Sequence, residues 1–191
     1  MNQTTLIVVA VVVIVAVLVI TGLIWSRRRR FEHLRDRFGP EYEHAIAHEG
    51  GRAKAEAELA KREKRVSKLD IRPLEPAARL NFIDRWKEVQ AQFVDDPARA
   101  VASADALLGE VMTARGYPVS DFDQRAGDIS VDHPEVVKHY RAGHDIALRH
   151  AQGQASTEDL RQAMIHYRAL FDELVNETDA PAVERETEAA H

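Results

Sequence analysis

The stretch from Asp132 to Val175 decides the fold, and it reads DHPEVVKHYRAGHDIALRHAQGQASTEDLRQAMIHYRALFDELV. Pro134 suits the first turn of a helix, and Gly153 is a residue at which helices end. Ser156 then provides a second start signal, followed by acidic residues that favour a helix N-terminus. The stretch therefore predicts two consecutive helices joined by a short turn.

Both predicted helices are amphipathic. Apolar or weakly polar side chains recur every three or four residues, which places them on one helix face. In the first helix they are Val137, Tyr140, His144, Ala147, Leu148 and Ala151. In the second they are Leu160, Met164, Tyr167, Phe171 and Leu174. Two such stripes predict helices that bury one side in a shared core.

Further helices are predicted towards the N-terminus. Residues 77–94 carry an apolar stripe, Asp96-Pro97 caps a helix that runs to about Arg115, and Gly116 ends it. A short helix follows, lined by Phe122, Ala126 and Ile129. Residues 71–176 are thus predicted to form a small four- to five-helix bundle, a length that supports its own core.

A charged segment from Arg52 to Leu69 precedes the bundle and reads RAKAEAELAKREKRVSKL. Alanine, glutamate, lysine and arginine are strong helix formers, so residues 52–70 are predicted to be a charged helix. The favoured interpretation is a solvated spacer, because apolar positions are few. The alternative is a coiled coil through which the chain forms a homo-oligomer.

The segment from Leu6 to Trp25 contains 20 residues and no charge. A helix of that length spans about 30 Å, the thickness of a bilayer core, so the sequence predicts a transmembrane helix. Residues 1–5 are then a short external N-terminus, and Trp25 lies where interfacial aromatic residues are common. The predicted fold class is all-α: a transmembrane helix, a spacer helix and a bundle.

Four arginines, Arg27, Arg28, Arg29 and Arg30, follow the apolar segment, and no lysine or arginine precedes it. The positive-inside rule predicts that the N-terminus lies outside and the rest lies in the cytoplasm. Two interpretations of the arginines stay open: they only set the membrane orientation, or they also contact anionic lipid. Residues 26–51 are predicted to be a basic juxtamembrane segment with a short helix, and residues 177–191 a disordered acidic tail.

Composition excludes several chemistries. The net charge of −5 offers no basic domain for nucleic acid, and the chain has no cysteine for thiol chemistry or thiolate-bound metal. His44 and His48 share a helix face but lack a third ligand, so no metal, cofactor or catalytic residue is predicted. An alternative is a ligand-binding or enzymatic pocket near His144, with Tyr140 and Tyr167.

The irregular stretch after Gly116 combines aromatic residues with a bent backbone, and Tyr117, Pro118 and Phe122 are the predicted partner surface. The competing interpretation, which is favoured, is a connection between helices that packs on the bundle.

Four strings resemble a family of bacterial hypothetical proteins: FGPEYEHAI from Phe38, KREKRVSKLDIRPL from Lys61, a string from Arg85 to Val119, and the opening stretch. The resemblance covers roughly Phe38 to Val175. It implies single-pass membrane proteins with a helical soluble domain and no assigned activity. It also implies a bacterial host, and hence the cell inner (cytoplasmic) membrane.

Together these features predict a membrane-tethered helical interaction or scaffold module rather than an enzyme. Its expected partners are the lipid bilayer and a protein, because a tether raises the local concentration of a weak binder near membrane partners.

Overall fold

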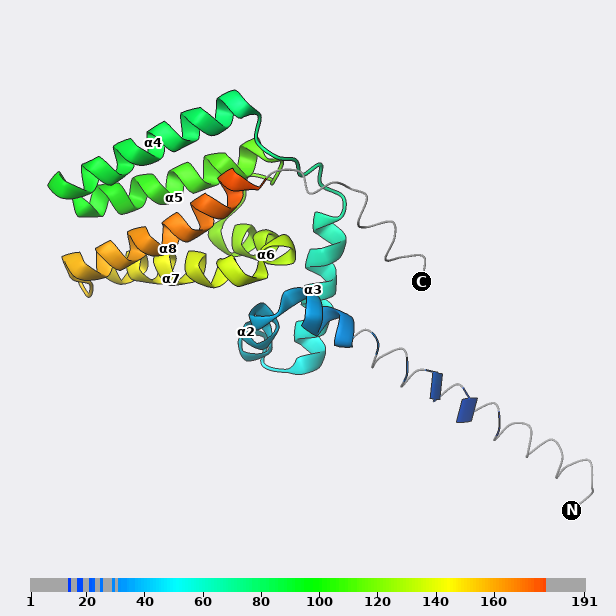
Figure 1. Cartoon of the computed structure of the whole chain (residues 1–191). Coiled ribbons are helices and arrows are strands. Elements are labelled where there is room, and N and C mark those ends of the chain that lie inside the picture. The colour runs from blue at the N-terminus through cyan, green and yellow to red at the C-terminus, as the bar shows by residue number, and fades with distance from the viewer. Residues whose placement is uncertain are drawn as a thin grey trace, which may run out of the picture. The chain divides into compact units, whose positions relative to one another are not determined.

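A computed structural model describes residues 31–177 without a break, and residues 14, 17, 18, 21, 22, 25 and 29 before them (Figure 1). All regular secondary structure in this described part is helical. The chain forms two compact units, residues 1–60 and 61–191, and the boundary between them falls within one helix.

The first unit contains helical residues 31–38, then α2 (Pro40–Glu49) and the first part of α3 (Arg52–Val66). Gly39 and Gly50 flank α2 with φ values of 44° and 69°, a region in which glycine is favoured. Tyr42 is almost fully buried, and its hydroxyl donates a hydrogen bond of 3.0 Å to Glu56. The short helix that the sequence predicts within residues 26–51 is therefore present.

Helix α3 forms where the charged segment predicts a helix, but it is not solvated on all sides. Ala55, Leu59 and Val66 share one face and are almost fully buried. Within the second unit, Arg65 of α3 forms an ion pair of 2.6 Å with the buried carboxylate of Asp128. The solvated-spacer interpretation fails at this face, and oligomerisation through α3 stays a prediction.

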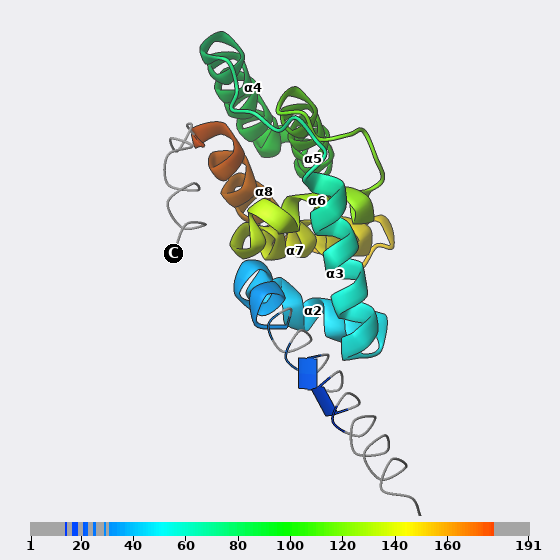
Figure 2. The same ribbon diagram turned by 90° about the vertical axis from the view of Figure 1, so that its right-hand side faces the viewer.

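The second unit is an all-α bundle made of two hairpins with a short helix between them (Figures 1 and 2). The first hairpin joins α4 (Pro76–Asp95) to α5 (Pro97–Ala114), and the second joins α7 (Pro134–Ala151) to α8 (Thr157–Asn176). Helix α6 (Phe122–Asp132) connects the hairpins. The four- to five-helix bundle predicted from the sequence is confirmed.

Helices α5 and α8 begin at the capping residues that the sequence indicates. The Asp96 side chain accepts a bond of 3.0 Å from the Arg99 backbone N–H at the start of α5. Ser156 and Asp159 form a reciprocal capping box at the start of α8, which satisfies backbone donors that a helix leaves unpaired. Local capping therefore fixes both hairpin turns.

Helices α5 and α8 form the centre of the bundle. Helix α5 packs against α4 and α8, α8 packs extensively against α7, and α6 packs against α7. The core is apolar, and it includes a stacked pair, Trp86 and Phe171, whose ring centroids are 4.6 Å apart. Beyond this stacked pair, α4 and α8 make few contacts with each other.

A buried arginine fixes the C-terminal end of α8. The Arg115 side chain is 2% exposed, and its guanidinium donates to the carbonyls of Arg72 and Leu174. It also pairs with Glu177, which in turn lies 3.1 Å from Nε2 of His133. Because buried charges require partners, this network ties the end of α5, the linker and the end of α8 together.

The predicted fold class is wrong in one part, the transmembrane helix Leu6–Trp25. Among the described residues, no helix is both long and apolar enough to cross a bilayer. The helices of sufficient length are charged: even α5 carries Arg99, Asp105 and Glu110. Most of Leu6–Trp25 lies outside the described residues, so the location and orientation inferred from it stay predictions.

The acidic tail predicted for residues 177–191 also lies outside the described part, apart from Glu177.

Candidate functional site

The predicted partner surface is largely packed into the bundle. Tyr117 is 3% exposed, its hydroxyl donates a bond of 3.2 Å to Asp132, and burial raises its pKa. Phe122 stacks on His144 with ring centroids 3.5 Å apart, while Pro118 is half-buried. Tyr117 is therefore a core residue, and the stretch has the contacts of a packed connection.

Of the predicted lipid-contacting residues, the structure describes Trp25 and Arg29. The Arg29 guanidinium carbon lies 3.8 Å from the centroid of the Trp25 ring, a cation–π distance. Arg27, Arg28 and Arg30 lie outside the described residues.

The residues of the alternative pocket near His144 lie together but are tightly packed. Tyr140 and Tyr167 are both fully buried, and the Tyr140 hydroxyl donates a bond of 3.1 Å to Asp105. His144 is covered by the ring of Phe122, and burial lowers its pKa. The two hollows described below have other linings, so these three side chains do not surround either of them.

Two histidine pairs deserve comparison as metal ligands. His44 and His48 stack on α2 with centroids 6.2 Å apart, and the described residues contain no cluster of three or more metal-binding side chains. His139 and His166 face each other from α7 and α8, with Nδ1 atoms 3.1 Å apart, a hydrogen-bond distance. The sequence did not reveal this second pair, because its members lie on different helices.

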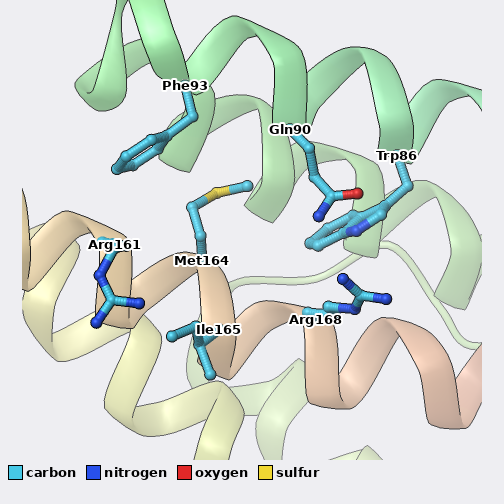
Figure 3. A pocket seen from close by; sticks show the side chains of 7 residues that line it. All are labelled: Trp86, Gln90, Phe93, Arg161, Met164, Ile165 and Arg168. Carbon is cyan, nitrogen blue, oxygen red and sulfur yellow. The ribbon is translucent and has the colours of Figure 1, made fainter.

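The candidate functional site is a groove between α4 and α8, which we call the α4–α8 groove (Figure 3). It has a volume of about 210 Å³. Its lining consists of Trp86, Gln90 and Phe93 from α4, and of Arg161, Met164, Ile165 and Arg168 from α8. Figure 3 shows the aromatic side chains of α4 facing the side chains of α8 across the groove.

Helical spacing explains how each wall forms. Trp86, Gln90 and Phe93 lie four and three residues apart, so they share one face of α4. On α8, Arg161 and Arg168 lie seven residues apart, with Met164 and Ile165 between them. The result is an apolar floor with a cation at two points along the α8 wall.

Burial differs across the groove. Trp86 is 4% exposed and Met164 is 8% exposed, whereas Ile165 is 47% exposed. Phe93 is half-buried. The groove thus presents apolar surface to solvent beside residues that already belong to the core. Such exposed apolar surface with a polar rim is typical of an interaction site.

Each rim arginine has an acidic partner on its own helix. Arg161 donates bonds of 2.8 Å and 2.6 Å to Glu158, and Arg168 donates one bond of 3.3 Å to Asp172. The Arg161 hydrogen bond lowers the pKa of Glu158 to about 2. Both arginines are exposed, and a guanidinium carries five N–H donors, so the bonds to Glu158 and Asp172 leave donors for further acceptors.

One polar atom in the lining lacks a partner. The indole Nε1 of Trp86 is buried and has no hydrogen-bond acceptor among the described residues. Buried donors are normally paired, so this indole N–H is an exception among the buried groups of the bundle.

The apolar stripe predicted within residues 77–94 includes Trp86 and Phe93, but it does not reveal the groove. The available signal was Ile165, an apolar residue outside the predicted stripe of its helix, between two arginines. That pattern alone does not tell which helix lies opposite, so it could not define the site.

Comparisons of this chain with models of known protein families, with curated proteins and with solved structures found no match. The resemblance to bacterial hypothetical proteins stays a prediction.

Proposed function

We propose that this protein is a helical interaction module that binds an acidic amphipathic helix of a partner protein in the α4–α8 groove. The observation that carries the proposal is the exposed apolar side chain of Ile165 in a groove that Trp86, Arg161 and Arg168 also line. A groove between two helices is a common receptor for the apolar face of a third helix.

The apolar part of the groove suits a helix that presents apolar side chains at helical spacing. Phe93 and Ile165 offer partly exposed surface, and Trp86 provides a rigid aromatic wall. Aromatic side chains frequently dominate the energy of protein interfaces. A partner helix that covers Ile165 would remove this apolar surface from water, which is the main favourable term in such association.

The charge of the rim favours an acidic partner. Arg161 and Arg168 lie two helical turns apart, which corresponds to about 10 Å along α8. Two carboxylates seven residues apart on a partner helix have the same spacing, so both arginines can be paired at once. Arginine also forms strong, directional bonds with carboxylates.

Tryptophan fluorescence provides a direct test. The chain has two tryptophans, Trp25 and Trp86, so the full-length Trp25→Phe variant keeps a single reporter in the groove. Two amphipathic peptides of about 18 residues, or five turns, would share one leucine face and differ only in glutamate or lysine at the flanking positions. We expect the glutamate peptide to change Trp86 fluorescence and to bind at least tenfold more tightly.

Matched variants test the location. Arg161→Gln with Arg168→Gln is expected to remove the preference for the acidic peptide. Arg149→Gln, which breaks a similar exposed pair with Asp145 on α7, is expected to leave it unchanged. Equal binding of both peptides, or an equal effect of the two sets of variants, would refute the proposal.

A second pair of variants tests the apolar floor. Ile165→Asp places a charge in the groove, and Leu148→Asp places one at a comparably exposed position on α7, since the two side chains are 47% and 51% exposed. Only Ile165→Asp is expected to abolish peptide binding. Loss of binding in both variants, or in neither, would contradict the assignment of the groove.

A further inference from the structure

A second hollow lies between α4, α5 and residues 118–120, and we call it the α5 hollow. Its volume is about 470 Å³, which falls within the range of roughly 300–1,000 Å³ that is usual for small-molecule sites. Its lining is mainly apolar or small, and it includes Phe82, Ala106, Pro118 and Val119. The α5 hollow shares no lining residue with the α4–α8 groove.

A single arginine, Arg125 of α6, gives the α5 hollow a chemical preference. Its side chain is 18% exposed, and its Nε has no hydrogen-bond acceptor among the described residues. Arg125 forms an ion pair with Asp105, whose carboxylate lies 3.5 Å from Nη2. Asp105 also accepts a hydrogen bond from the Tyr140 hydroxyl. Arg125 therefore retains donors for an anion.

A glycine leaves room for the Arg125 guanidinium. A Cβ atom at Gly109 would lie 2.7 Å from Nη1 of Arg125, closer than real contacts allow. Gly109 lies inside α5, where glycine normally weakens a helix. Its presence lets the planar guanidinium lie directly on the backbone of α5, at the wall of the hollow.

The acidic residue in the lining does not compete for Arg125. Glu110 accepts two hydrogen bonds from Arg85, of 2.6 Å and 2.8 Å. Hydrogen bonding to Arg85 lowers the pKa of Glu110. The hollow thus combines an apolar wall, a neutralised carboxylate and a guanidinium with donors to spare. Planar guanidinium groups recognise carboxylates with two parallel hydrogen bonds.

We propose that the α5 hollow binds a small monocarboxylate with an alkyl chain. The carboxylate pairs with Arg125, and the chain lies on Phe82 and beside Val119. Val119 is 87% exposed, so an apolar ligand would cover a side chain that water now surrounds. This ligand site is separate from the α4–α8 groove and does not depend on the function proposed for that groove.

Calorimetric titration of the full chain with octanoate, 1-octanol and octylamine tests the proposal. The three probes share an alkyl chain and differ in the charge of the head group. We expect octanoate to bind at least tenfold more tightly than 1-octanol, and octylamine to bind more weakly still. Arg125→Gln is expected to remove the advantage of octanoate over 1-octanol.

Because Arg125→Gln can also disturb folding, a second pair of variants uses the exposed Val119. Val119→Glu is expected to weaken octanoate binding several-fold by repulsion, and Val119→Lys to strengthen it, without loss of the folded state. Absence of octanoate binding, equal binding of octanoate and 1-octanol, or identical affinities in the two Val119 variants would overturn the proposal.

Discussion

At the level of single residues, close contacts rather than residue type decide which positions are essential. Gly143 shows this most clearly: it lies in α7 against α8, and a Cβ atom there would be 2.6 Å from Cε1 of Tyr167. The Tyr167 ring is fully buried and is held by the surrounding core, so it has little freedom to move aside.

Gly143→Ala is therefore expected to destabilise the bundle. The gain in helix propensity is about 1 kcal/mol, but overpacking of a core typically costs about 1–3 kcal/mol. We expect a net loss of about 1 kcal/mol in the free energy of unfolding, measured by urea denaturation. An increase in stability, as at an open helix position, would show that the two helices are less closely packed than described.

The sequence could not reveal such contacts. Gly143 resembles a helix-weakening residue, and Tyr117 resembles a surface aromatic in a turn, yet both are buried. Their roles depend on which helix lies opposite, and residue spacing along one helix contains no such information. Nothing in the sequence around Arg115 indicates burial either, although its side chain is buried against backbone carbonyls and Glu177.

At the level of elements, the sequence was a better guide. Helix starts at Pro97, Pro134 and Thr157 follow directly from proline or capping residues, and the observed bounds match the predicted ones closely. The apolar stripes predicted amphipathic helices, but Leu148 is 51% exposed despite its place in a stripe. Stripes define a helix face only approximately, because each neighbour covers a different part of it.

The junction of α6 and α7 with the end of α8 carries a pH-dependent contribution to stability. Burial opposes protonation of His133, and the charge of Arg115 does so too. Hydrogen bonds to Glu177 and Glu173 and the charge of Glu177 outweigh both effects, so the pKa of His133 is raised. The His133 hydrogen bond and then that of Arg115 lower the pKa of Glu177 to about 2, against an opposing effect of burial.

The signs define a pH window. Because the pKa of His133 is raised on folding, its contribution to stability is complete at pH values below its unfolded pKa of about 6.5. That contribution is lost as the pH rises through the pKa of the folded state. The lowered pKa of Glu177 stabilises above about 4.5, and the effect is lost as pH falls towards 2. We expect His133→Gln to reduce the free energy of unfolding more at about pH 5.5 than at about pH 8.5.

Urea denaturation of the wild type and His133→Gln at both pH values would measure this difference directly. A stability loss of the same size at both values would mean that the imidazole acts only by packing.

At the level of the whole molecule, the sequence indicated an all-α bundle, and the described residues form one. The candidate site was not predictable in the same way. The α4–α8 groove exists because α4 packs on α5 and meets α8 only slightly, and this arrangement follows from the packing of all the helices together. The α5 hollow likewise requires Gly109 and Arg125 to meet across two helices.

The central claim is that an acidic amphipathic helix binds in the α4–α8 groove. The most direct measurement is a nuclear magnetic resonance titration of the isotope-labelled full-length Trp25→Phe variant with the glutamate peptide. The account predicts that the indole N–H signal of Trp86 and the backbone amide of Ile165 shift together and saturate, while the amide of Leu148 stays in place. An unchanged Trp86 signal, or shifts centred on Leu148, would contradict it.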